Sequence, residues 1–286
     1  EWRGIGFAHA GAGPAEHFDP AAHDLLYIGG GQDRDQRMVA ADMVAGKRAD
    51  LAAAVESGAP LLAVCGGYQL LGHSYQLDEE TLPGLGVADL ETVREPGPRL
   101  IGNVEIEVDF GGGPRVLAGF ENHGGRTYLG PGAEPLGRVL HGFGNNGRDG
   151  LEGVRRANLI GTYLHGPLLP KNAWLADLLI ALALERRYGT RPELEPLEDA
   201  LEDAAHRLAR QVAEAGCAGA AAAGAEAALA AGRLGERGRL DRLGERDRGQ
   251  HELGDAVPRR HPEGLRRVGV EQEDADFAAV AGVDQA

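Results

Sequence analysis

The sequence predicts an α/β protein with an open, mostly parallel, doubly wound sheet, followed by a low-complexity C-terminal tail. Three observations predict this class. Short apolar runs alternate with helical patterns over the first 190 residues, glycines directly follow two of these runs, and a long amphipathic helix closes the pattern. The chain of 286 residues is 43% hydrophobic and 26% charged, a composition typical of globular proteins.

The predicted strands are short apolar runs that end at turn residues. In chain order they are Ile5–His9, Leu25–Ile28, Leu61–Val64, Gly86–Val93, Asn103–Phe110, Val116–Phe120, Val139–His141 and Asn158–Leu164. The predicted helices carry apolar residues at helical spacing, and they are Asp33–Val55, Tyr68–Gly72, Lys171–Tyr188 and Leu197–Val212. Gly46 is a candidate break in the first helix, and Gly189 ends the third.

Three regions follow from these patterns. Residues 1–190 form the α/β domain, residues 191–215 an amphipathic C-terminal helix, and residues 216–286 a tail that we expect to be disordered. The tail is rich in Ala, Gly, Arg and acidic residues and has no apolar stripe, so it offers little surface to bury. Two alternatives remain for it: an extension that binds a partner, or residues read from the wrong frame of GC-rich DNA.

Composition excludes several functions. The chain has no run of about 18 uncharged apolar residues, so no membrane-spanning helix is expected. A net charge of −15 argues against binding to nucleic acid or to an anionic membrane surface. Two cysteines, Cys65 and Cys217, provide neither a disulfide framework nor a zinc motif, and a cytoplasmic location is the default expectation.

Cys65 is the most informative position. It stands between a predicted buried strand and a helix, in Leu-Leu-Ala-Val-Cys-Gly-Gly-Tyr-Gln, which is the pattern of a strand–nucleophile–helix elbow. The start of a helix favours the thiolate, and the amide of Gly66 is suited to stabilise an oxyanion on an attacked carbonyl carbon. The alternative interpretation is a buried structural cysteine.

His165 is the candidate base, because it follows a predicted strand and would meet Cys65 at the carboxyl edge of a parallel sheet. Gly29-Gly30-Gly31 lacks a nucleotide-binding pattern and fits better as the source of a second oxyanion amide. A histidine that caps a turn and a plain tight turn are the respective alternatives.

Other polar residues are less decisive. His123, His141 and His165 show no paired spacing, so no metal site is expected. Glu121 and Asn122 are candidates to orient a substrate or the base, or else they only cap a strand end.

Five motifs occur in one order along the chain, and together they resemble class I glutamine amidotransferase domains of the cobyric-acid-synthase type, from about Glu1 to Tyr188. They are Tyr-Ile-Gly-Gly-Gly-Gln-Asp-Arg-Asp-Gln, Ala-Val-Cys-Gly-Gly-Tyr-Gln-Leu-Leu-Gly, Arg-Leu-Ile-Gly-Asn, Gly-Phe-Glu-Asn-His-Gly-Gly-Arg-Thr and Gly-Thr-Tyr-Leu-His-Gly-Pro.

The resemblance implies a fold of the class I glutamine amidotransferase type, with Cys65 as nucleophile and His165 as base. It further implies that Arg99 holds the glutamine and that Gly30, or a neighbour in its loop, is the second oxyanion donor beside Gly66. Two departures stand out. Pro167 occupies the place where many class I enzymes carry a glutamate, and the strand and helix with which the family begins are missing upstream of Glu1.

The activity implied is hydrolysis of glutamine to glutamate and ammonia. The ammonia would pass to a Mur-ligase-like partner that uses ATP and Mg²⁺ to amidate the D-glutamate of lipid II, so no cofactor is expected in this chain. Three alternatives stay open: a glutaminase domain of cobyric acid or cobyrinate synthesis, a cysteine hydrolase on the same fold, and a binding module without activity.

Overall fold

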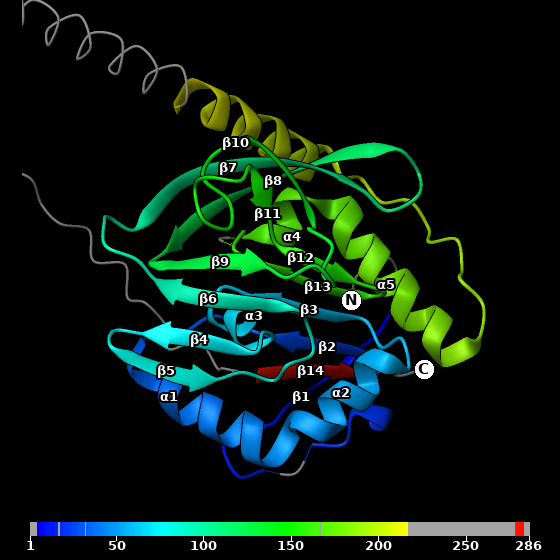
Figure 1. Cartoon of the computed structure of the whole chain (residues 1–286). Helices are drawn as coiled ribbons and strands as arrows, with labels where there is room; N and C mark the ends of the chain where they lie inside the picture. The colour runs from blue at the N-terminus through cyan, green and yellow to red at the C-terminus, as the bar shows by residue number, and fades with distance from the viewer. Residues whose placement is uncertain (1–4, 17, 32, 166, 217–277, 283–286) are drawn as a thin grey trace, which may run out of the picture. The chain divides into compact units, whose positions relative to one another are not determined.

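The computed structural model describes residues 5–16, 18–31, 33–165, 167–216 and 278–282 (Figure 1). Its strands are β1 (Ala8–Gly11), β2 (Leu25–Ile28), β3 (Leu61–Val64), β4 (Ser74–Leu77), β5 (Glu80–Pro83), β6 (Leu90–Arg94), β7 (Leu100–Asp109), β8 (Pro114–His123), β9 (Gly125–Leu129), β10 (Gly137–His141), β11 (Leu151–Glu152), β12 (Val154–Arg156), β13 (Leu159–Thr162) and β14 (Ala278–Gly282). Its helical elements are η1 (Pro20–Ala22), α1 (Asp33–Asp42), η2 (Met43–Lys47), α2 (Arg48–Glu56), α3 (Gly66–Leu70), α4 (Leu168–Lys171), α5 (Ala173–Tyr188) and a helix at 200–216.

The central sheet has the strand order β1-β14-β2-β3-β13-β12. Its middle is parallel, because β3 pairs in parallel with β2 and with β13, and Thr162 lies opposite Val64 at the carboxyl end. The other pairs of this sheet are antiparallel. The expected α/β fold is therefore present, but the expectation of a mostly parallel sheet is corrected to a mixed sheet with a parallel centre.

Two further sheets lie beside the central one, with strand orders β11-β10-β7-β8 and β5-β4-β6-β9. The long β7–β8 hairpin runs from the pair Leu100–His123 to the pair Asp109–Pro114. The strands β4, β5, β9, β11 and β12 were not predicted from the sequence, nor was β14 in the tail. The first five are short and are interrupted by polar residues, so they lack the apolar run by which a strand is recognised.

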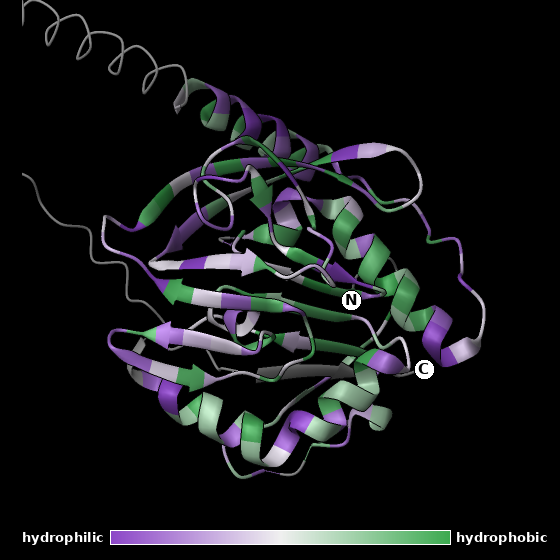
Figure 2. Cartoon of the chain, in the orientation of Figure 1, coloured by the Kyte–Doolittle hydropathy of each residue, from purple (hydrophilic) through white to green (hydrophobic). Residues whose placement is uncertain are grey.

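The core divides at β3, whose alternate side chains face two clusters. Leu61 and Ala63 belong to the cluster that contains residues of α1, η2 and α2, whereas Leu62 and Val64 pack with residues of β7, β8 and α5. Figure 2 shows hydrophobic residues along β3 and α5. Because β3 is buried on both faces, its carboxyl end is held in a fixed place.

The helices follow the sequence with local changes. The predicted helix Asp33–Val55 is divided into α1, the π-helical turn η2, which contains Gly46, and α2. The helix predicted at Lys171–Tyr188 begins slightly later, at Ala173, and ends at Gly189, which adopts φ +77°. The described residues contain no helix long and apolar enough to cross a bilayer.

The boundaries of the C-terminal helix and of the tail differ from those predicted. The helix covers 200–216 rather than the whole of 191–215, and its Ala213 side is buried while Leu201 and Leu208 are exposed. Most of the predicted disordered tail lies outside the described residues. Its five described residues form β14, which pairs with both β1 and β2, so the expected disorder does not extend to them.

Candidate active site

Cys65 occupies a sharp turn directly after β3. Its backbone adopts φ +52° and ψ −109°, a conformation that non-glycine residues rarely take, and its amide donates to the carbonyl of Thr162 at 2.9 Å. The turn is close-packed, because a Cβ built on Gly67 would lie 2.4 Å from the carbonyl oxygen of Ile28. The predicted elbow is therefore present, with its thiol half-buried above the sheet edge.

The glycine loop after β2 meets this elbow. A Cβ built on Gly30 would lie 3.1 Å from Cys65 Cβ and 3.8 Å from its Sγ. A Cβ built on Gly66 would lie 3.5 Å from the amide nitrogen of Gly31 and 2.7 Å from Gln36 Nε2. The two strand–helix turns that the sequence predicted to supply oxyanion amides therefore lie side by side at the thiol.

His165 lies three residues beyond β13, the parallel neighbour of β3. Its backbone exchanges two hydrogen bonds with Phe120 of β8, and its ring meets the Phe120 ring edge-on at 6.0 Å. Among the described residues, its buried Nε2 has no hydrogen-bond partner. Burial lowers the pKa of His165, and the charges of His123 and Arg99 lower it further, so the neutral form of the ring is favoured near pH 7.

Arg99 stands just before β7 and borders the same cavity as Cys65. Its Nε and Nη2 donate to the side-chain and backbone oxygens of Asn122, each at 2.9 Å. These bonds fix the guanidinium and leave Nη1 available to a ligand. The cavity is also bordered by Arg94, so two guanidinium groups and one thiol border the same space, and a guanidinium group is suited to pair with a carboxylate.

Glu121 and His123 form a buried pair, and His123 borders this cavity. The sequence did not decide the role of either residue. Glu121 is fully buried and accepts from the amides of Phe143 at 2.7 Å and Gly144 at 2.9 Å, so its side chain neither caps the strand end nor enters the cavity. His123 Nε2 lies 3.7 Å from Glu121 Oε2, and the His123 ring stacks on Tyr163. Glu121 and His123 are two residues apart in the sequence. This spacing is the feature from which the pair could have been predicted, because it places both side chains on one face of a strand.

The sequence analysis missed Glu152. This buried carboxylate accepts from the hydroxyl of Thr162 and from the amide of Tyr163 at 2.7 Å, and thereby fixes the turn that leads to His165. Burial raises the pKa of Glu152 to about 8. Nothing in the local sequence around Glu152 indicates this contact, because its partners lie ten residues further along the chain.

A half-buried cysteine in a strand–helix elbow, a neutral histidine after the next parallel strand and an anchored arginine across the cavity form a site suited to acyl transfer from an amide. Residues 13–173, which are 161 of the 286 residues, match the CobB/CobQ-like glutamine amidotransferase domain, and the chain belongs to this family. The family resemblance predicted from the five motifs is confirmed.

Individual relatives differ in how similar they are to this chain. The chain is 46% identical to the lipid II isoglutaminyl synthase (glutamine-hydrolyzing) subunit GatD of Staphylococcus aureus, over 57% of this chain and 65% of that protein. It is 39% identical to the GatD subunit of Streptococcus pneumoniae, over 65% of this chain and 71% of that protein. Similarity to the cobyric acid synthase of Rhodobacter capsulatus is lower, at 36% over 54% of this chain and 32% of that protein.

The chain thus spans about two thirds of the length of these GatD subunits and about one third of the cobyric acid synthase. Cys65, Gly30 and Gly66 lie together, His165 follows the adjoining strand β13, and Arg99 lies across the cavity. The catalytic and binding roles of these five residues stay predictions.

Proposed function

We propose that this chain is the glutaminase subunit of a lipid II isoglutaminyl synthase. The observation that carries the proposal is the strained elbow at Cys65, where the thiol, the glycine loop and the strand end that leads to His165 converge. The higher identity to GatD subunits, over a larger share of their length, favours this assignment over cobyric acid synthesis.

In the proposed reaction, the Cys65 thiolate attacks the side-chain amide carbon of glutamine and forms a tetrahedral oxyanion. The amide of Gly66 and an amide of the Gly30 loop donate hydrogen bonds to this oxygen. Each such donor contributes about 10²–10³-fold in rate, because it is already oriented before the charge develops.

His165 accepts the proton of the Cys65 thiol as the thiolate forms and then transfers it to the departing nitrogen, and the carbon–nitrogen bond breaks to release ammonia and leave a thioester on Cys65. The neutral imidazole next accepts a proton from water, the hydroxide attacks the thioester, and glutamate leaves as the thiolate is restored. Arg99 binds the α-carboxylate of the substrate through Nη1, since its Nε and Nη2 each already donate to Asn122.

The ammonia is consumed by a partner subunit. We assign this role to a Mur-ligase-like protein, MurT, which would bind ATP and Mg²⁺ and amidate the D-glutamate of lipid II. Glutamine hydrolysis by the mechanism above needs no cofactor from this chain. An ATP-dependent partner and the thiol chemistry of Cys65 both suit the reducing cytoplasm.

The test is glutaminase activity of the Cys65→Ser variant and alkylation of the native chain by a glutamine-analogue electrophile. We expect a loss of at least about 10³-fold in the variant and covalent labelling of Cys65 alone in the native chain. Retained hydrolysis in Cys65→Ser would contradict the mechanism. The lipid II assignment is tested separately: the chain with MurT and ATP should amidate lipid II, whereas amidation of a cobyrinate acceptor instead would support the second candidate.

A further inference from the structure

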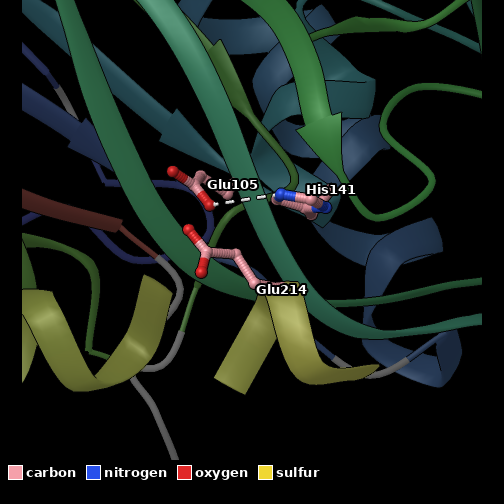
Figure 3. A group of neighbouring side chains, drawn as sticks. All are labelled: Glu105, His141 and Glu214. Atoms are coloured by element: carbon pink, nitrogen blue, oxygen red, sulfur yellow. Dashed lines mark ion pairs between the residues drawn. The ribbon is translucent and has the colours of Figure 1, made fainter. Parts of the chain in front are cut away.

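Outside the active site, three side chains converge from distant parts of the chain. Glu105 comes from β7, His141 from the end of β10, and Glu214 from the helix at 200–216 (Figure 3). One ligand atom from each lies within 4.8 Å of the other two. Glu105 and His141 are register partners on neighbouring strands, so the sheet itself fixes their separation.

The buried carboxylate of Glu105 provides the evidence for a bound ligand. Its side chain is only 1% exposed, and its Oε1 accepts from Arg210 Nε at 2.7 Å. Its Oε2 is buried and has no hydrogen-bond partner among the described residues, and His141 Nε2 is 3.9 Å away. A buried carboxylate oxygen without a donor is costly, and a bound cation is one way to offset that cost.

We propose that Glu105, His141 and Glu214 bind a divalent transition-metal ion of the Zn²⁺ type. One imidazole nitrogen and two carboxylates form a ligand set that Zn²⁺ uses, with water in the remaining position. Ca²⁺ requires six to eight oxygen ligands, and Mg²⁺ prefers oxygen ligands, so neither matches a site with an imidazole. No metal site was expected from the sequence, because its histidines show no paired spacing, and the three residues of this site are far apart along the chain.

The geometry allows the site to close around an ion. Ligand atoms at about 2.1 Å from Zn²⁺ lie about 3.4 Å apart in a tetrahedral site, so the present separations must shrink by roughly 1 Å. Glu214 is exposed and free to move inward by a change of rotamer, whereas Glu105 and His141 stay on the sheet. Arg210 then remains on the second oxygen of Glu105 and orients that carboxylate toward the ion.

The ion would act as a structural clamp. It would link the helix at 200–216 to β7 and β10, and this inference does not depend on the proposed glutaminase reaction. Because the three ligands are brought together only in the folded chain, the ion binds the native state and should raise the melting temperature.

The experiment uses the full 286-residue chain, stripped of metal with EDTA, dialysed and titrated with ZnCl₂ against a chromophoric competitor. We expect one Zn²⁺ per chain, a Kd in the micromolar range or tighter, and a rise in Tm of about 5 °C at saturation. Co²⁺ bound in place of Zn²⁺ should give visible absorption bands that change when the imidazole is removed.

Two variants locate the site. His141→Asn and Glu214→Gln should each weaken Zn²⁺ binding by at least about 10-fold and remove most of the Tm rise. Glu214 is exposed, so its variant should fold even if changes at Glu105 do not. His73→Asn is the matched control, because His73 pairs with Asp89 at 3.0 Å in a different sheet region and should leave binding unchanged. An absence of saturable binding, or binding that His141→Asn and Glu214→Gln leave intact, would overturn the proposal.

Discussion

The two sides of the active-site cavity are built in different ways. On the side of β3 and β13, backbone geometry places the reactive groups: Cys65 lies in a strained turn, and His165 is held by a two-way backbone bridge to Phe120. On the side of the β7–β8 hairpin, side-chain hydrogen bonds do the positioning, as between Arg99 and Asn122.

Because the two sides position their residues differently, mutations on the two sides should have different effects. A side chain on the β3–β13 side can be replaced without disturbing the backbone that holds it, so chemistry should be lost while the fold remains. Gly67 on that side cannot be replaced without a shift of the chain, because an added Cβ would meet the backbone of Ile28 and Gly29. Changes on the hairpin side should mainly weaken substrate binding. The following predictions test this division, from the largest expected effect to the smallest.

Replacing His165 by glutamine should reduce kcat for glutamine hydrolysis by about 10²–10⁴-fold, because the proposed mechanism uses this ring for each proton transfer. The melting temperature should change little, since the backbone bridge to Phe120 does not involve the ring. Steady-state kinetics and thermal unfolding measure the two effects. A variant with near-native kcat would remove His165 from the mechanism.

Gly67→Ala should destabilise the protein by about 2 kcal/mol or more, because the added Cβ would lie 2.4 Å from the carbonyl oxygen of Ile28. The matched control is Gly46→Ala, where no atom lies within 4 Å and alanine favours the helix. Chemical denaturation should show a loss for the first variant and a neutral or stabilising change for the second. Equal stabilities would mean that the elbow is not close-packed.

Arg99→Ala should raise the KM for glutamine by about 10–100-fold and leave kcat within about twofold, because a carboxylate contact is made equally in the ground and transition states. Asn122→Ala should raise KM less, since it only releases the guanidinium from its anchor. Arg138→Ala on β10 is the control and should have no effect. A fall in kcat at unchanged KM would refute the binding role of Arg99.

Glu152 should make stability depend on pH. The unfolded carboxyl ionises near its ordinary pKa of 4.5, whereas burial raises the pKa of folded Glu152 to about 8, so the folded state binds more protons between these values. The free energy of unfolding contributed by this group therefore falls as the pH rises from about 4.5 to 8.

Glu152→Gln removes that titration and keeps the side-chain shape. Between pH 5.0 and 7.5 the variant should gain more than about 1 kcal/mol relative to the native chain, since one pKa unit corresponds to about 1.4 kcal/mol. Urea denaturation at both pH values measures the gain, with the exposed Glu134→Gln as control. Parallel pH profiles for Glu152→Gln and the native chain would contradict the prediction.

Local sequence predicted one side of the cavity much better than the other. The bounds of β2 and β3 were predicted to the residue, because each is a continuous apolar run that ends in glycine or cysteine. The placement of Cys65 beside Gly30 followed from the parallel pairing of those strands. By contrast, β4 has half-buried polar residues at alternate positions and β5 has exposed ones, so neither forms a continuous apolar run.

The contacts that could not be predicted join residues distant along the chain. Glu152 of β11 accepts from Thr162 of β13, a strand of a different sheet, and Glu105 meets Arg210 over 105 residues of sequence. No periodicity or motif connects such partners, because their proximity is decided by the tertiary packing of β7, β10, β13 and the helix at 200–216.

The bridge between His165 and Phe120 has a consequence for solubility. β8 is the last strand of its sheet, and its outer edge would be open to pairing with a strand of another molecule. Two contacts occupy that edge: Asn172 bonds both the amide and the carbonyl of Ala118, at 3.0 and 2.8 Å, and His165 does the same for Phe120 through its backbone. The segment that carries the proposed base therefore also shields an aggregation-prone edge, so variants that loosen it should be recognised by self-association as well as by lost activity.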